Sequence, residues 1–157
     1  MKRYLIALAL IAGLMCVSLV LYAADNQVGT WKLNLARSKY DPANLAPKST
    51  TAKLEAVPDG IKATVDTVNS ENQKIHYEFT AKYDGKDYPI GGDPTRDSIS
   101  YRRIDDYTFE SVSKKAGKVT VTTRNVYAKD GKSRTLTTTG TNDKGQKVNN
   151  TTVWDKQ

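Results

Sequence analysis

The sequence predicts an all-β protein: an antiparallel up-and-down β-barrel of about eight to ten strands, preceded by an N-terminal signal segment. Three observations predict it. Apolar and polar residues alternate with a period of two along most of the chain after residue 24. Turns that contain glycine, asparagine or aspartate separate these segments at short intervals, and none of the segments has the period of a long helix. Closing such a meander removes its two exposed edges, and an open sandwich with a similar number of strands is the alternative.

The first 24 residues have the composition of a secretory signal. Lys2 and Arg3 precede an apolar run over residues 4–22, and Ala23 and Ala24 follow it. We therefore expect an exported bacterial protein, periplasmic or secreted, with a single barrel domain over residues 25–157. The apolar run of about 20 residues is also long enough to stay in a membrane as an uncleaved anchor, and this alternative remains open. Cys16 is the single cysteine and lies inside the signal, so the exported domain has no disulfide.

Charged residues occur singly along the predicted exported domain, without clusters. Removing Lys2 and Arg3 from the 24 basic residues leaves 22, against 17 acidic residues, which is a net charge of +5. These charges alternate singly with other residues and form no basic run, so we expect no nucleic-acid partner. The faces expected to point outward carry charges such as Lys53 and Glu78. A lipid-facing band would be apolar there, so we expect no membrane span in the exported domain.

The first predicted strand covers residues 29–35, where Trp31, Leu33 and Leu35 form one apolar face. We expect it to close the barrel against the last strand, near residues 151–156, with Trp31 and Trp154 filling the interior. Residues 36–49 follow without a steady period and contain Pro42 and Pro47, which disfavour a long helix. We expect at most one helical turn here, in a strap across a barrel end.

Nine further strands are expected in order. Six segments alternate between apolar and polar residues, near 51–56, 61–67, 74–83, 87–90, 97–104 and 107–114. Asp84-Gly85 signals a hairpin between the third and fourth of them. Gly117, Gly131 and Gly145 then fall fourteen residues apart in turns of about four residues, and they separate the last strands. Residues 91–96 form the longest break and are expected as a mobile loop at the barrel mouth.

The predicted inner face supplies the candidate ligand-binding residues. A core held by packing alone would consist of Leu, Ile and Val throughout, whereas inward tyrosine and threonine hydroxyls suit water or a small apolar or amphipathic molecule. A filled barrel with exposed arginines stays open as the alternative. The candidate lining residues are Trp31, Tyr77, Phe79, Tyr101, Phe109, Arg124, Thr152 and Trp154. Alternation also assigns to this face Val119, Val121, Thr135, Thr137 and Thr139. The further candidates for an inward cation are Arg102, Arg103 and Arg134.

The residue pattern does not predict catalysis. His76 is the single histidine and lies on the polar face of its strand, without a partner nucleophile. Asp105 and Asp106 are adjacent and are expected to cap a turn instead of forming an acid–base pair. The spacing of the other acidic residues fits no calcium-binding loop. We therefore expect neither an enzyme nor a bound cofactor or metal ion.

Two resemblances add to this prediction. The first strand, Gly29-Thr30-Trp31, and the last, Thr151-Thr152-Val153-Trp154-Asp155-Lys156, resemble those of the lipocalin and fatty-acid-binding-protein (calycin) superfamily. This resemblance implies a closed barrel around a small apolar ligand. A family of uncharacterised exported bacterial lipocalin-like proteins is similar over Ser38-Lys39-Tyr40, Tyr83-Asp84-Gly85-Lys86-Asp87-Tyr88-Pro89 and Gly145-Gln146-Lys147-Val148-Asn149-Asn150, and it implies the fold without an established activity.

One departure from the first resemblance limits what it implies. Fatty-acid-binding proteins hold a carboxylate with an arginine two residues before a tyrosine on the last strand, and Thr152 and Trp154 stand at these positions here. A threonine cannot make that charge-assisted contact. We expect a small-molecule-binding or carrier protein for a partly apolar ligand. The alternative is a solid-cored structural or protein-interaction module of the bacterial envelope, with residues 36–49 or 91–96 as its partner surface.

Overall fold

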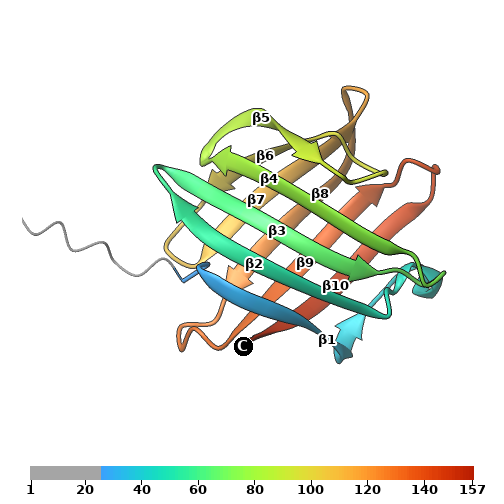
Figure 1. Cartoon of the computed structure of the whole chain (residues 1–157), viewed down its shortest axis with the longest axis horizontal. Helices are drawn as coiled ribbons and strands as arrows, with labels where there is room; N and C mark the ends of the chain where they lie inside the picture. The colour runs from blue at the N-terminus through green and yellow to red at the C-terminus, as the bar shows by residue number, and fades with distance from the viewer. Residues whose placement is uncertain (1–25) are drawn as a thin grey trace, which may run out of the picture.

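A computed structural model describes residues 26–157, so the predicted signal over residues 1–24 lies outside the described residues. Ten antiparallel strands form a closed barrel, in which each strand pairs with its sequence neighbours and the first pairs with the last (Figure 1). The predicted all-β, up-and-down antiparallel barrel is confirmed, and the open sandwich is excluded.

The strands are between six and eleven residues long. They are β1 (Gly29–Lys39), β2 (Ser49–Val57), β3 (Gly60–Val68), β4 (Lys74–Lys82), β5 (Asp84–Gly91), β6 (Ser98–Arg103), β7 (Thr108–Lys115), β8 (Lys118–Tyr127), β9 (Ser133–Thr141) and β10 (Lys147–Lys156). A turn of 3₁₀ helix, η1 (Ala43–Leu45), lies between β1 and β2. The turns that separate the strands coincide with the glycine and aspartate positions that predict them, because these residues accept the backbone angles of tight turns.

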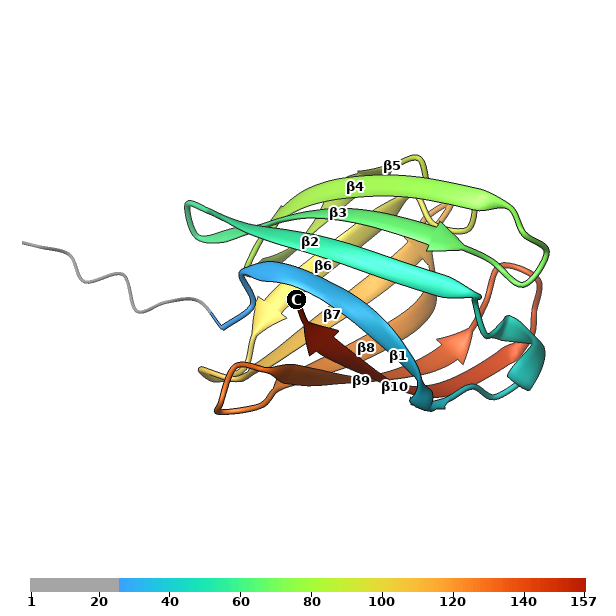
Figure 2. The ribbon, with the colours of Figure 1, turned by 60° about the horizontal axis from the view of Figure 1, so that its bottom comes forward.

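The pairing of β1 with β10 closes the barrel. Trp31 lies opposite Lys156, and the N–H of Gln157 donates a 2.9 Å hydrogen bond to the carbonyl of Thr30. Figure 2 shows the C-terminus against β1. The predicted pairing of the first strand with the last is confirmed, and closure gives the backbone groups of both strands a partner.

β1 loses its alternation after Asn34. Leu35 is 40% exposed, so its predicted place on the buried face is wrong. The register of β1 and β10 shifts between Asn34 and Lys39. There the hydroxyl of Ser38 donates a 2.6 Å hydrogen bond to the Asn34 carbonyl and accepts one of 2.9 Å from the Val153 N–H. Leu35 lies inside this bulged segment, where the alternation of faces is interrupted, and the residue pattern of one strand cannot anticipate such a bulge.

Residues 40–48 run along one end of the barrel (Figures 1 and 2) and contain the single helical turn expected there, η1. The N–H of Asn149 donates to the Asp41 carbonyl at 2.9 Å, and the N–H of Lys48 donates to the Val68 carbonyl at 2.8 Å. The segment is therefore fastened to both β10 and β3. Tyr40 packs against the core, and burial raises the pKa of its phenol to about 12.

The inner face of β8 and β9 differs from the prediction. Thr120 is an extra residue in β8, because Lys114 pairs with Val119 and Ser113 pairs with Val121. Thr120 is buried, whereas Val119 is 59% exposed. The other residues wrongly assigned to the inner face lie on the outer face of β9: Thr135, Thr137 and Thr139. Both strands carry threonine on both faces, so the alternation of apolar and polar residues cannot determine their register.

Candidate ligand-binding site

Aromatic side chains fill one end of the barrel. Trp31, Phe109 and Tyr127 are fully buried. The ring centroids of Trp31 and Tyr127 are 5.4 Å apart, and those of Phe109 and Tyr127 are 5.8 Å apart. Nε1 of Trp31 donates a 2.8 Å hydrogen bond to the carbonyl of Gln27, so the chain before β1 packs over this end. Trp31 and Phe109 thus belong to a packed plug and do not line the cavity described next.

Beside the plug the barrel contains a cavity of about 110 Å³. Four predicted lining residues lie on its wall: Tyr77, Phe79, Tyr101 and Trp154. β2 and β3 add aliphatic side chains, and β7, β8 and β9 add polar ones, among them Ser111, Thr123, Asn125 and Arg134. At about 30 Å³ per water molecule, the cavity has room for three or four waters. It is smaller than the roughly 300–1,000 Å³ of pockets for drug-sized ligands.

Two predicted lining residues lie elsewhere. Thr152 is buried, and its Oγ1 accepts a 3.0 Å hydrogen bond from Nε1 of Trp154. Arg124 is exposed and lies on the outer face of the sheet, opposite Glu110 on β7 and Thr137 on β9, so its prediction as a lining residue is wrong. The prediction for Arg124 is wrong for the same reason as the predictions for the β9 threonines, because the residue pattern does not determine the register of these strands.

Of the four arginines that the sequence offers as inward cations, Arg134 is the one that the fold buries. Its residue is 5% exposed, and its guanidinium carbon lies 4.8 Å from the ring centre of Trp154 and 5.1 Å from that of Trp31. Nη1 donates a 3.1 Å hydrogen bond to the hydroxyl of Tyr127, whereas Nε is buried and makes no hydrogen bond. Among residues 26–157, no carboxylate forms an ion pair with Arg134.

Asn125 and Tyr101 form the polar wall beside Arg134. Nδ2 of Asn125 donates a 3.2 Å hydrogen bond to the hydroxyl of Tyr101. The Oδ1 atom of Asn125 is buried without a hydrogen-bond partner. Burial raises the pKa of the Tyr101 phenol above its usual range, so this hydroxyl stays neutral and acts as a hydrogen-bonding group.

Arg96 reaches the cavity from the break between β5 and β6, a role that sequence reasoning missed. Its guanidinium lies 4.9 Å from the ring centre of Tyr77, and its Nη2 is 2.6 Å from Oδ2 of Asp93. Burial opposes ionisation of Asp93, but the charge of Arg96 and hydrogen bonds from Thr95 outweigh it and lower the pKa of the carboxyl. The loop predicted to be mobile is therefore fastened by a partly buried ion pair. A charged residue in a polar loop gives no sequence signal that it points inward.

His76 lies on the outer face of β4 and has no access to the cavity. Its Nδ1 is 2.8 Å from Oδ1 of Asp66, which is the residue opposite it on β3. Both side chains are more than half exposed. This exposed pair lacks the buried pocket and the neighbouring nucleophile that a general base requires.

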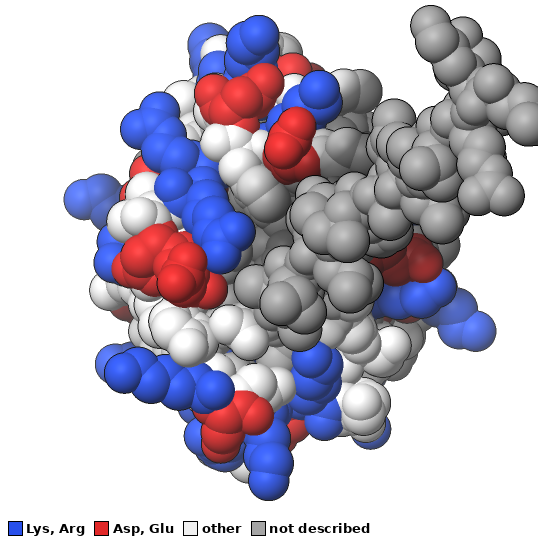
Figure 3. Space-filling model, turned by 90° about the vertical axis from the view of Figure 1, so that its left-hand side faces the viewer, with Lys and Arg blue, Asp and Glu red and all other residues white. Residues whose placement is uncertain are grey.

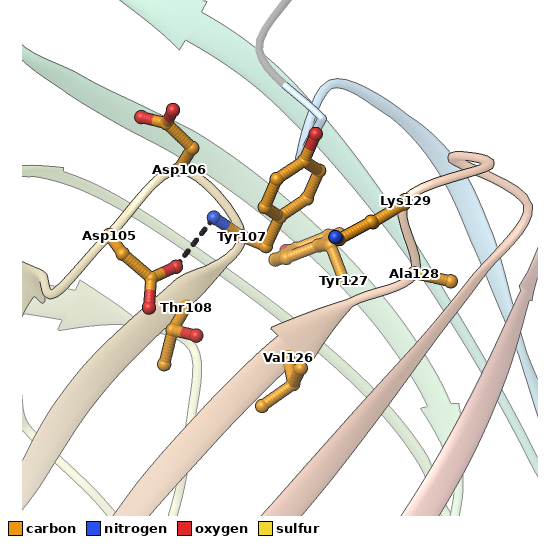
Figure 4. A pocket seen from close by; sticks show the side chains of 8 residues that line it. All are labelled: Asp105, Asp106, Tyr107, Thr108, Val126, Tyr127, Ala128 and Lys129. Atoms are coloured by element: carbon orange, nitrogen blue, oxygen red, sulfur yellow. Dashed lines mark hydrogen bonds between the residues drawn. The ribbon is translucent and has the colours of Figure 1, made fainter.

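Asp105 and Asp106 lie in a turn at the rim of an open surface groove of about 720 Å³. Figure 4 shows the two carboxylates pointing in different directions, with Tyr107 and Tyr127 beside them. Oδ1 of Asp105 accepts a 2.8 Å hydrogen bond from the N–H of Tyr107, which lowers the pKa of this carboxyl. Asp105 therefore caps its turn, as predicted, and its carboxylate points away from that of Asp106.

The surface carries both signs of charge, and Figure 3 shows basic and acidic side chains interspersed on one face. Within residues 26–157, no group of three or more His, Cys, Asp or Glu side chains is placed to hold a metal ion. In the same part of the chain, no helix has the length and apolar character needed to cross a membrane.

Comparison with protein-family models and with curated proteins gave no match for this chain. The lipocalin-like resemblance therefore stays a prediction.

Proposed function

We propose that this protein is exported and binds one small, partly apolar molecule inside the barrel, without catalysing a reaction. The mixed lining of the cavity supports the proposal. β2, β3 and β4 contribute aliphatic and aromatic side chains, and β7, β8 and β9 contribute mainly polar ones. Two polar atoms of this wall, Oδ1 of Asn125 and Nε of Arg134, are buried without a hydrogen-bond partner. An unpaired buried polar group costs about 1–3 kcal/mol, and a ligand that hydrogen-bonds to both removes that cost.

The volume of the cavity sets an upper limit on the size of the ligand. A cavity of about 150 Å³ accommodates benzene, so about 110 Å³ suits a molecule no larger than that. Long-chain fatty acids, isoprenoids and haem exceed this volume several times over. The proposed ligand is therefore a small molecule with one apolar part and one hydrogen-bonding part, which matches the two kinds of wall.

Isolation of the protein from its own envelope, followed by native mass spectrometry, tests the proposal directly. We expect a co-purified small molecule that binds again in calorimetry. Ala63 lines the cavity and is 1% exposed, so Ala63→Val narrows the site and lowers affinity by about tenfold through overpacking. Ala56→Val is the matched control, because Ala56 is exposed at the end of β2 and lies outside the cavity lining, and it leaves affinity unchanged. Unchanged affinity in Ala63→Val, or the absence of any binding in a panel of small alcohols, amides and acids, would contradict the proposal.

A solid-cored interaction module is the second candidate. The small size of the cavity and the larger groove beside Asp105 and Tyr107 (Figure 4) favour it. This groove lies outside the two partner surfaces suggested by the sequence, residues 36–49 and 91–96. Under this second function no small molecule binds, and Tyr107→Ala weakens cross-linking to an envelope protein whereas Ala63→Val does not.

A further inference from the structure

The cavity contains one positive charge that none of the described residues 26–157 neutralises. Two guanidinium groups line it, those of Arg96 and Arg134. Arg96 is neutralised by Asp93, whose side chain is 6% exposed and lies 2.6 Å away. Arg134 has no such partner among the described residues 26–157. A buried charge is stable only when it is paired or well hydrogen-bonded, so the cavity has an excess of one positive charge.

The groups around Arg134 compensate this charge only in part. The rings of Trp31 and Trp154 attract a cation through their faces. They do not accept hydrogen bonds from the edge of the guanidinium plane, which carries five N–H groups. The hydroxyl of Tyr127 accepts one of these at 3.1 Å, and the Nε–H has no acceptor. The edge of the guanidinium group thus lacks the planar, negatively charged acceptor for which its geometry is suited.

The register of β8 and β9 brings a second unpaired group next to the first. Arg134 lies opposite Tyr127, and Leu136 lies opposite Asn125. Arg134 and Asn125 are therefore diagonal neighbours on the inner face, a spacing that long side chains bridge. Oδ1 of Asn125 needs a hydrogen-bond donor, and Nε of Arg134 needs an acceptor. One small molecule that carries both groups a few atoms apart satisfies both.

We propose that the ligand is a small carboxylate that also carries a hydrogen-bond donor, the chemical class of short hydroxy acids. Its carboxylate pairs with Arg134, its hydroxyl donates to Oδ1 of Asn125, and its carbon chain lies against Tyr77 and Phe79. An inorganic anion lacks the carbon chain that this apolar wall accommodates. The inference rests on the proposed function and specifies the ligand class for the same cavity.

This arrangement is separate from a carboxylate site on the last strand. Oγ1 of Thr152 already accepts the hydrogen bond of Trp154 Nε1, at 3.0 Å. The proposed site uses an arginine of β9 and an amide of β8 instead. A ligand bound there fits within about 110 Å³, which excludes the long acyl chain of a fatty acid.

Calorimetry with lactate, propionate and propionamide tests the charge and the donor separately. Propionamide is the neutral counterpart of propionate. Lactate is propionate with one added hydroxyl. We expect propionate to bind at least tenfold more tightly than propionamide, and lactate about tenfold more tightly than propionate. Arg134→Gln abolishes binding of both acids, whereas Arg124→Gln, which changes an exposed arginine on the neighbouring strand, leaves binding unchanged. Asn125→Ala reduces the affinity for lactate to that for propionate.

NMR of the wild-type protein keeps the test independent of whether Arg134→Gln folds. The Nε–H resonance of Arg134 is expected to shift on titration with lactate, while that of Arg124 stays in place. Equal binding of propionamide and propionate would overturn the carboxylate assignment and leave small-molecule binding standing. Failure of all three compounds, together with failure of the wider panel, would overturn both proposals. Binding of the acids with no change at the Arg134 resonance would place their site elsewhere and overturn this inference.

Discussion

Replacing Trp31 by alanine tests whether this side chain holds the closed end of the barrel together. Trp31 has no exposed surface, and burial of a tryptophan removes about 150–250 Å² from water. At about 25 cal/mol per Å², this burial is worth about 4–6 kcal/mol, and alanine retains only a small part of it. The carbonyl of Gln27 also loses the hydrogen bond from Nε1. We expect Trp31→Ala to lower the free energy of unfolding by about 4–5 kcal/mol, within the range known for Trp→Ala in cores.

Urea unfolding followed by far-ultraviolet circular dichroism measures this loss. The slope of the unfolding free energy against urea concentration shows whether the denatured state has changed. Leu35→Ala is the matched control on the same strand, because Leu35 is 40% exposed. We expect the control to cost less than about 1 kcal/mol. A loss below about 1 kcal/mol for Trp31→Ala itself would show that Trp31 is not the packed plug and that the register of β1 is wrong.

Two further predictions concern the β8 bulge and the loop ion pair. Gly140 has a φ of +146°, and a Cβ there would overlap the Thr120 carbonyl. Gly140→Ala should therefore lower the urea midpoint by an amount equivalent to about 2 kcal/mol or more of unfolding free energy. Gly117→Ala is the control, because Gly117 has open space around it, and it should lower the free energy of unfolding by about 1 kcal/mol. An equal effect at both glycines would argue against the bulge. Because the folded-state pKa of Asp93 is lowered, its ion pair with Arg96 stabilises the protein above the unfolded pKa of about 3.9, and this contribution disappears as the pH falls through the lower folded pKa. Asp93→Asn should therefore have a lower melting temperature than the wild type at pH 7, and its melting temperature should fall less below about pH 4. If the melting temperature of Asp93→Asn falls with pH as much as that of the wild type, the ion pair is not the source of the acid sensitivity.

The interior shows where sequence reasoning succeeds and where it stops. Tyr77, Phe79 and Tyr101 lie on strands where apolar and polar residues alternate clearly, and all three face the cavity. Arg124 lies on a strand with threonine on both sides, and its predicted direction is wrong. A strand with two similar faces has no preferred register of its own, so its neighbours decide which face is buried.

Arg134 and Arg96 mark the part of the candidate site that the residue pattern could not supply. Arg134 was one of several arginines compatible with an inward position, and its burial depends on Trp31 and Trp154, which come from the opposite ends of the chain. Arg96 enters the cavity through its ion pair with Asp93, within a loop that has no periodic pattern. Both placements depend on contacts between segments that are distant in sequence or irregular, and local propensity does not describe such contacts.

The sequence by itself determined the all-β class, the ten strands, most turn positions and the pairing of the first strand with the last, because alternation and turn chemistry are local properties of the chain. The tertiary structure alone decided the bulge between Asn34 and Lys39, the extra residue Thr120, the outward direction of Arg124 and the burial of Arg134. Each of these depends on which residue of a neighbouring strand lies opposite. In a closed barrel that pairing is fixed only when all strands are in place, so the chemistry of the cavity follows from closure and not from any one segment.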